Sequence, residues 1–261
     1  MTNSNGKPAT AGGNSLPINF REELEKQSQA IQNRISQPTG DRIRMVPGRG
    51  FTLPNGQEGE EIEVAIIDFV SANLYYESGF DRDNPQPPGC FAVGPEPSLL
   101  MPVDESPDKQ SDTCAACPNN QFGSAGKGKA CKNTRLLAVT PISEDGNEDA
   151  PIWIISVPPT SIKAFDSYVF KLSTKQRTLP IALVTRISLD QDVTYVAPRF
   201  EAVRPLDDQE LATVFPMREE AMTRLMALPD FSGFDPNAGR GGRNPAGRSG
   251  LGGVQSRRGG R

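Results

Sequence analysis

The stretch that decides the fold is EIEVAIIDFVSANLYY, residues 61–76. It is rich in β-branched and aromatic side chains, which favour a strand over a helix. Its length and the small residues Ser71, Ala72 and Asn73 near its middle predict one long strand with a central bend. A long bent strand of this kind is common in small closed barrels. We therefore expect a β-rich core organised around residues 61–76.

Further strand and helix patterns flank this stretch on both sides. Short β-branched or alternating runs between turn residues predict strands at residues 42–46, 51–53, 135–140, 151–157, 181–189, 193–196 and 200–203. Apolar residues at helical spacing predict helices over residues 20–35, 159–172 and 206–228. The order is that of an α+β protein and not of alternating βαβ units. An OB-like antiparallel β-barrel with peripheral helices fits this order, and a two-sheet sandwich fits it nearly as well.

Four cysteines lie between this long strand and the next predicted strand. Cys90, Cys114, Cys117 and Cys131 follow the spacing C-x23-C-x2-C-x13-C. The Cys-Ala-Ala-Cys turn can direct two sulfurs at one ion, and the outer two cysteines can complete a tetrahedron. Four thiolates leave no open coordination position, so a structural zinc is expected in this insertion, residues 88–134. An iron–sulfur cluster, a redox-active CxxC pair and four unrelated core cysteines remain alternatives.

Composition excludes several classes of enzyme. The chain has no histidine, which rules out Ser-His-Asp triads, Cys-His dyads, HExxH metalloproteases and the His-containing deaminase signature. We expect a protein that is not an enzyme. No apolar run is long enough to cross a bilayer, and residues 1–17 lack the apolar core of a secretory signal. A reducing cytoplasm, with no membrane partner, is the expected location, where cysteines are ligands more often than disulfides.

Charge and composition divide the chain into three parts. Residues 1–17 are polar and without periodicity, which predicts a disordered segment. Residues 18–230 hold the expected domain with its cysteine insertion. Residues 231–261 form a Gly/Arg-rich tail with six arginines, also predicted to be disordered, in a chain whose net charge is −4. The body is therefore acidic, and a cationic arm follows it.

The residues around the cysteines carry a resemblance to a known family. CAACPNNQFGS at residues 114–124, GKACK at residues 128–132 and RLLAV at residues 135–139 resemble tailed-bacteriophage single-stranded-DNA-binding proteins with a four-cysteine insertion. The likeness covers about residues 20–200. It implies a protein of phage DNA replication or recombination with an OB-like core, working in the cytoplasm of the bacterial host with phage replication or recombination proteins as partners. One departure is that many such proteins end in an acidic tail, whereas this chain ends in arginine and glycine.

A single-strand binder needs cations for phosphates and exposed aromatic rings for bases. The candidate cations are Arg42, Arg44, Arg49, Lys127, Lys129, Lys132 and Arg135, with the tail residues Arg240, Arg243 and Arg258. The candidate stacking rings are Phe51, Tyr75, Tyr76, Phe80 and Phe122. We expect Phe69, Trp153, Phe165 and Phe170 to be core residues instead.

Two other functions compete with single-stranded DNA binding. The first is a phage structural or protein-interaction protein whose zinc knuckle docks a partner. The second is a metal-dependent nuclease using Asp81, Asp83 and Asp104. Those carboxylates lie in Asp/Pro/Asn-rich loops and do not form a cluster on a predicted strand or helix, so the nuclease ranks last.

Overall fold

The computed structural model describes residues 40–77, 86–142, 150–232 and 234. The chain separates into two units, residues 1–41 and 42–261, and only Gly40 and Asp41 of the first are described. Fold and site therefore belong to the second unit. The predictions for residues 1–17, the helix over 20–35, Phe80 and the tail arginines Arg240, Arg243 and Arg258 lie outside the described residues.

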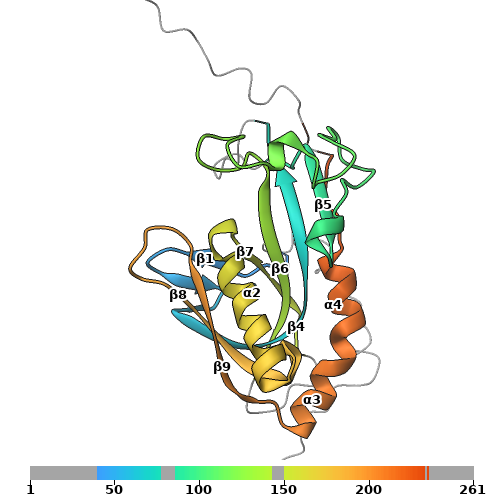
Figure 1. Cartoon of the computed structure of the whole chain (residues 1–261). Helices are drawn as coiled ribbons and strands as arrows, with labels where there is room; N and C mark the ends of the chain where they lie inside the picture. Colours follow the sequence, from blue (N-terminus) through green and yellow to red (C-terminus); the bar gives the residue numbers. More distant parts are fainter. Residues whose placement is uncertain (1–39, 78–85, 143–149, 233, 235–261) are drawn as a thin grey trace, which may run out of the picture. The chain divides into compact units, whose positions relative to one another are not determined.

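The predicted long strand is the centre of the larger sheet (Figure 1). β4 (Glu61–Tyr75) pairs along most of its length with β6 (Lys132–Pro141). On its other side, its first residues pair with β8 (Leu183–Leu189) and its last residues with β5 (Cys90–Gly94). β7 (Trp153–Val157) lies beyond β6, and β9 (Pro198–Pro205) beyond β8, all antiparallel. β4 therefore connects the β8–β9 end of the sheet to the cysteine loops.

A β-bulge in β4 sets which side chains face which side of the sheet. The register with β6 shifts between Ile66 and Asp68. Val64 and Ile66 belong to one hydrophobic cluster before the bulge, and Phe69 packs against the same cluster after it. The alternation has thus moved by one residue, as a bulge requires. The bulge lies a few residues before the bend predicted near Ser71, Ala72 and Asn73.

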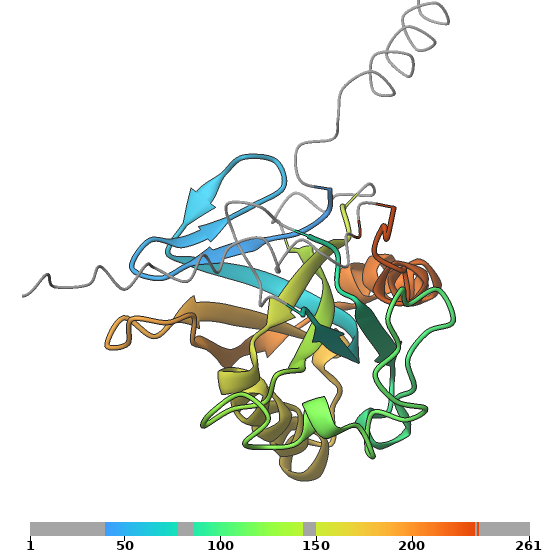
Figure 2. The ribbon, with the colours of Figure 1, turned by 90° about the horizontal axis from the view of Figure 1, so that it is seen from above.

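Helices cover both faces of this sheet (Figures 1 and 2). α2 (Ile162–Lys171) buries Phe165 and Tyr168 against one face, where the Phe165 ring lies 5.0 Å from that of Phe69. α3 (Asp208–Val214) and α4 (Arg218–Leu225) bury Val214, Ala221 and Leu225 against the other. The single helix predicted over residues 206–228 is interrupted by a 3-10 turn, Phe215–Met217, because proline cannot continue a helix.

A small sheet extends the N-terminal end of β4. β1 (Arg44–Val46), β2 (Gly50–Thr52) and β3 (Glu58–Gly59) are antiparallel, and β3 is followed after one residue by β4. The Ile43 amide donates to the Ile154 carbonyl at 2.9 Å, which joins this segment to β7.

The described strands form two antiparallel sheets with helices, which confirms the α+β class. The predicted closed barrel is not found, because within the described residues the strand order runs from β7 to β9 without those ends pairing. No helix in the described part of the chain is long and apolar enough to cross a membrane.

Candidate metal centre and nucleic-acid interface

The four cysteines meet at the end of the sheet formed by β4, β5 and β6. Cys90 is the first residue of β5 and pairs with Tyr75, and Cys131 immediately precedes β6 on the other side of β4. The loop between these strands brings back Cys114 and Cys117, and Cys114 is tied by its amide to the Leu100 carbonyl at 3.0 Å. All four thiols are free and buried. They line one cavity of about 10 Å³, here called the thiol cavity, which is room for a single water-sized or smaller occupant.

Burial and mutual proximity control the ionisation of these thiols. Burial, followed by the charges of Cys114, Cys117 and Cys90, raises the pKa of Cys131 to about 12. Burial also raises the pKa of Cys90 and Cys114. Two hydrogen bonds act in the opposite direction, one from the backbone of Gln110 to Cys90 and one from the Asn73 side chain to Cys114. Burial and proximity thus favour the neutral thiols of these three cysteines, and a bound cation would favour their deprotonated form.

The side-chain positions do not form a finished coordination shell. Among the described residues, no group of three or more Cys, Asp or Glu side chains is arranged to hold a metal ion as it stands. The shared cavity, the burial of all four thiols and the two hydrogen bonds to sulfur are the features that a four-thiolate site needs. The four buried thiols are therefore the donor atoms of a thiolate site in their chemistry alone, and metal binding by them belongs to the proposal below.

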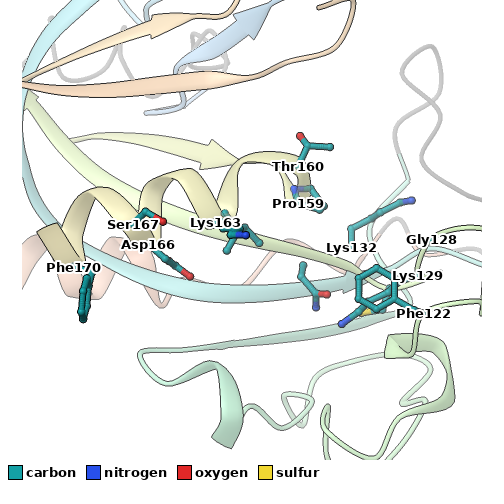
Figure 3. Close-up of a pocket in the computed structure, with 13 residues that line it drawn as sticks. Phe122, Gly128, Lys129, Lys132, Pro159, Thr160, Lys163, Asp166, Ser167 and Phe170 are labelled. Atoms are coloured by element: carbon teal, nitrogen blue, oxygen red, sulfur yellow. The ribbon is translucent and has the colours of Figure 1, made fainter.

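Beside the thiol cavity lies a groove of about 1000 Å³, here called the lysine groove. Figure 3 shows its two walls. One wall is α2 with the turn before it, and the other is the cysteine loop with the start of β6. Cys131 lines both the groove and the thiol cavity. The residues that line the groove are Phe122, Gly128, Lys129, Cys131, Lys132, Asn133, Pro159, Thr160, Ile162, Lys163, Asp166, Ser167 and Phe170.

The lysine groove combines exposed rings with positive charge. Phe122 is 83% exposed and Phe170 is 67% exposed. The ammonium of Lys129 lies 5.2 Å from the centroid of the Phe122 ring. Lys132 and Lys163 add two more cations to the lining. Rings that present a free face beside cations are the elements that single-stranded nucleic acid requires.

One acid lines the groove, and it is already paired. Asp166 binds the Arg135 guanidinium through two contacts of 3.1 and 3.0 Å. A third bond of 2.7 Å joins Arg135 to the hydroxyl of Ser71 on β4. This pair ties α2 to the sheet, and the part of the chain that the structure describes places no other carboxylate in the lining. The Arg135 side chain is 13% exposed and does not line the groove, and its predicted contact with nucleic acid stays a prediction.

The groove brings together three of the predicted nucleic-acid residues: Phe122, Lys129 and Lys132. Lys127 is exposed on the same loop but does not line the groove. Tyr75 lines the thiol cavity instead, where burial raises its pKa. Tyr76 is half-buried, and burial raises its pKa as well.

The remaining described candidates lie on or beside the small sheet. Phe51 is only 2% exposed and belongs to the core, so the prediction that it offers a stacking face is wrong. It is buried because β2 faces the cluster that contains Phe165. Arg42 donates to the Ser156 hydroxyl at 3.2 Å, and Arg44 and Arg49 are exposed. None of these three arginines lines the lysine groove.

Two groove residues were missed from the sequence, Lys163 and Phe170. The prediction that Phe170 is core is wrong, because its ring faces solvent at the groove. The spacing of apolar residues along this helix could have shown that Phe170 is exposed. Phe165, Tyr168 and Leu172 are buried at intervals of three and four residues, and Phe170 is out of phase with them.

Comparison of the chain with known protein families, with curated proteins and with solved structures gave no match.

Proposed function

We propose that this protein is a non-catalytic, sequence-tolerant single-stranded-DNA-binding protein stabilised by a structural zinc. The observation that carries the proposal is the lysine groove, where exposed Phe122 and Phe170 stand among Lys129, Lys132 and Lys163. A role in phage DNA replication or recombination, in the cytoplasm of a bacterial host, follows from the resemblance of the cysteine region and belongs to the same proposal.

The zinc half of the proposal rests on the thiol cavity. Zinc accepts four thiolates at roughly 2.3 Å per bond and needs no further ligand. Cys90, Cys114, Cys117 and Cys131 would hold it, and it would supply cohesion to a loop with few apolar side chains. No catalytic step is assigned to this site, because four protein ligands leave no position for a substrate.

The DNA half rests on the chemistry of stacking. A base stacked on an aromatic side chain contributes about 1–3 kcal/mol, whatever its identity. Two exposed rings and three lysines can therefore hold a short single strand without reading its sequence. The arginine-rich tail would add loose, salt-sensitive contacts from outside the described residues.

The nuclease alternative gains no support. Asp104 is exposed and contacts Lys109, and Asp81 and Asp83 lie outside the described residues. The acid in the lysine groove, Asp166, is paired with Arg135.

An oligonucleotide titration tests the DNA half. Fluorescence anisotropy of a labelled oligo-dT should show binding that weakens steeply as salt rises, because phosphate contacts release counterions. A duplex of the same length should bind more weakly, because its bases are not free to stack on the rings. Absence of binding to the single strand at low salt would overturn the proposal.

Elemental analysis tests the zinc half. Protein purified without chelator should carry about one zinc per chain. A content below about a tenth of that value would show that the thiol cavity is not a zinc site.

A further inference from the structure

Three asparagine side chains lie between the thiol cavity and the lysine groove. Asn73 on β4 and Asn120 in the cysteine loop line the thiol cavity. Asn133 on β6 lines the lysine groove. They come from three separate segments of the chain, and the β4–β6 register places Asn73 directly opposite Asn133. We call these residues the amide bridge.

Hydrogen bonds run from Asn133 through Asn73 and Asn120 to Cys114. The Asn133 amide donates to the side-chain oxygens of Asn73, at 2.5 Å, and Asn120, at 2.9 Å. Asn73 in turn hydrogen-bonds to the Cys114 thiol. Asn120 donates to the backbone carbonyl of Cys114 at 2.8 Å. Both branches therefore end at one cysteine of the thiol cavity.

The other end of the amide bridge is in the lysine groove. The Asn120 oxygen that accepts from Asn133 also accepts from the ammonium of Lys129 at 3.3 Å. That ammonium lies over the Phe122 ring. A displacement of Asn120 would therefore move the hydrogen-bond acceptor of Lys129. Cys131 also lines both the thiol cavity and the lysine groove.

Such a network has two physical consequences. Groups that hydrogen-bond to metal ligands fix the orientation of those ligands and strengthen metal binding. The side-chain oxygens of Asn73 and Asn120 are both held by the Asn133 amide, so the position of Asn133 constrains the other two. The bulge in β4 is what turns Asn73 toward this network, because Ser71 two residues earlier also faces the α2 side through its bond to Arg135.

We infer that Asn73, Asn120 and Asn133 are positioning residues that couple metal binding in the thiol cavity to single-strand binding in the lysine groove. This inference rests on the proposed function for both its metal half and its DNA half. By thermodynamic linkage, the ion then raises affinity for the single strand, and the single strand raises affinity for the ion by the same factor.

The first experiment measures the metal side alone. Asn133→Leu has nearly the same size but no donor, and Asn120→Ala lies in the loop, where a change should not unfold the sheet. Thr134→Val is the control, since it removes a single bond of the neighbouring residue to the Ala72 carbonyl. We expect both asparagine variants to lower zinc affinity about tenfold in chelator competition and to alter the cobalt–thiolate spectrum, and the control to do neither. Wild-type zinc affinity and cobalt spectra in both asparagine variants would overturn the positioning role.

The second experiment measures the coupling. Oligo-dT affinity should fall by about fivefold or more when zinc is removed from the wild-type protein, and by less in Asn120→Ala. Added oligo-dT should slow zinc transfer to a chelator in the wild type. Equal oligo-dT affinity with and without zinc would overturn the coupling. If the zinc-loaded wild type binds no oligo-dT at all, the proposed function fails, and the chelator experiment still decides whether the amide bridge positions the metal ligands.

Discussion

Phe122 and Phe170 are the residues on which stacking depends. They lie on opposite walls of the lysine groove, one in the cysteine loop and one on α2, and both are exposed. An exposed aromatic ring is common on protein surfaces, but two beside three lysines form a surface suited to bases and phosphates.

Removing either ring should weaken DNA binding. Phe122→Ala and Phe170→Ala should each cost about 1–3 kcal/mol of binding free energy for oligo-dT, measured by anisotropy. Phe215→Ala is the matched control, because Phe215 is similarly exposed but does not line the groove. Equal losses in all three variants would show that the effect is not local to the groove.

At the same scale, the sequence predicted the meeting of the cysteines better than the environments of the aromatic side chains. The C-x2-C spacing indicated that the four thiols meet, and they do line one cavity. Phe51 was predicted to be exposed and is buried, and Phe170 was predicted to be buried and is exposed. For Phe170 the phase relative to Phe165 and Tyr168 held the answer, whereas for Phe51 no such reference exists in a strand of three residues.

The helix α2 has two faces with different roles. Phe165 is fully buried against Phe69 and Phe200, while Phe170 on the same helix faces the groove. This difference follows from helical phase alone.

Substitutions on the two faces of α2 should differ in their effect on the free energy of unfolding. Phe165→Ala should lower the free energy of unfolding by about 3–5 kcal/mol, because it leaves a cavity in the core. Phe170→Ala should change it by less than about 0.5 kcal/mol, because the ring is at the surface. Urea unfolding followed by the fluorescence of the single tryptophan, Trp153, measures both. Comparable losses in the two variants would contradict the burial assigned to α2.

The start of α3 depends on a capping box. The Asp207 side chain accepts from the Glu210 amide, and the Glu210 side chain accepts from the Asp207 amide, both at 2.8 Å. Glu210 is also held by Arg204, which lowers the pKa of its carboxyl. A helix was predicted from residue 206 onward, but the capping box formed by Asp207 and Glu210 was not predicted.

Loss of the cap should be measurable and local. Asp207→Ala should cost about 1 kcal/mol of unfolding free energy, and Asp208→Ala, one residue further on, should cost clearly less. Oligo-dT affinity should stay at the wild-type value in both, since neither residue lines the groove. A larger loss in Asp208→Ala than in Asp207→Ala would reverse this assignment.

Element positions were more predictable from the sequence than their irregularities. The long strand over residues 61–76 and the helix over 159–172 are both present as β4 and α2. The bulge at Ile66 and Asp68 was not predicted, because β4 contributes apolar side chains to both faces of the sheet and so shows no clear alternation for a bulge to interrupt. It nevertheless decides that Asn73 lies in the amide bridge.

At the scale of the whole molecule, the α+β class was predicted and the closed barrel was not found. Strand pairing depends on long-range contacts that a local pattern does not contain. β5 and β8 both pair with the same side of β4, one at each end, so the sheet remains open between β7 and β9 among the described strands. The lysine groove lies where α2, with the turn before it, meets the cysteine loop and the start of β6.

The distribution of charge over the molecule differs between the chain as a whole and the lysine groove. The chain has a net charge of −4, yet its groove lining holds three lysines and one paired acid. A body of this charge repels nucleic acid except where cations are concentrated. Binding should therefore depend on the groove lysines far more than on lysines elsewhere.

The most direct test of the central claim is the salt dependence of oligo-dT binding by a triple variant, Lys129→Ala, Lys132→Ala and Lys163→Ala. Its control, Lys109→Ala, Lys171→Ala and Lys175→Ala, removes the same charge from exposed lysines outside the groove. If the groove lysines contact three phosphates, the slope of log affinity against log salt should fall by about 2 in the first variant and stay near the wild-type value in the second. Equal slopes in the wild type and both variants would contradict the assignment of single-strand binding to the lysine groove.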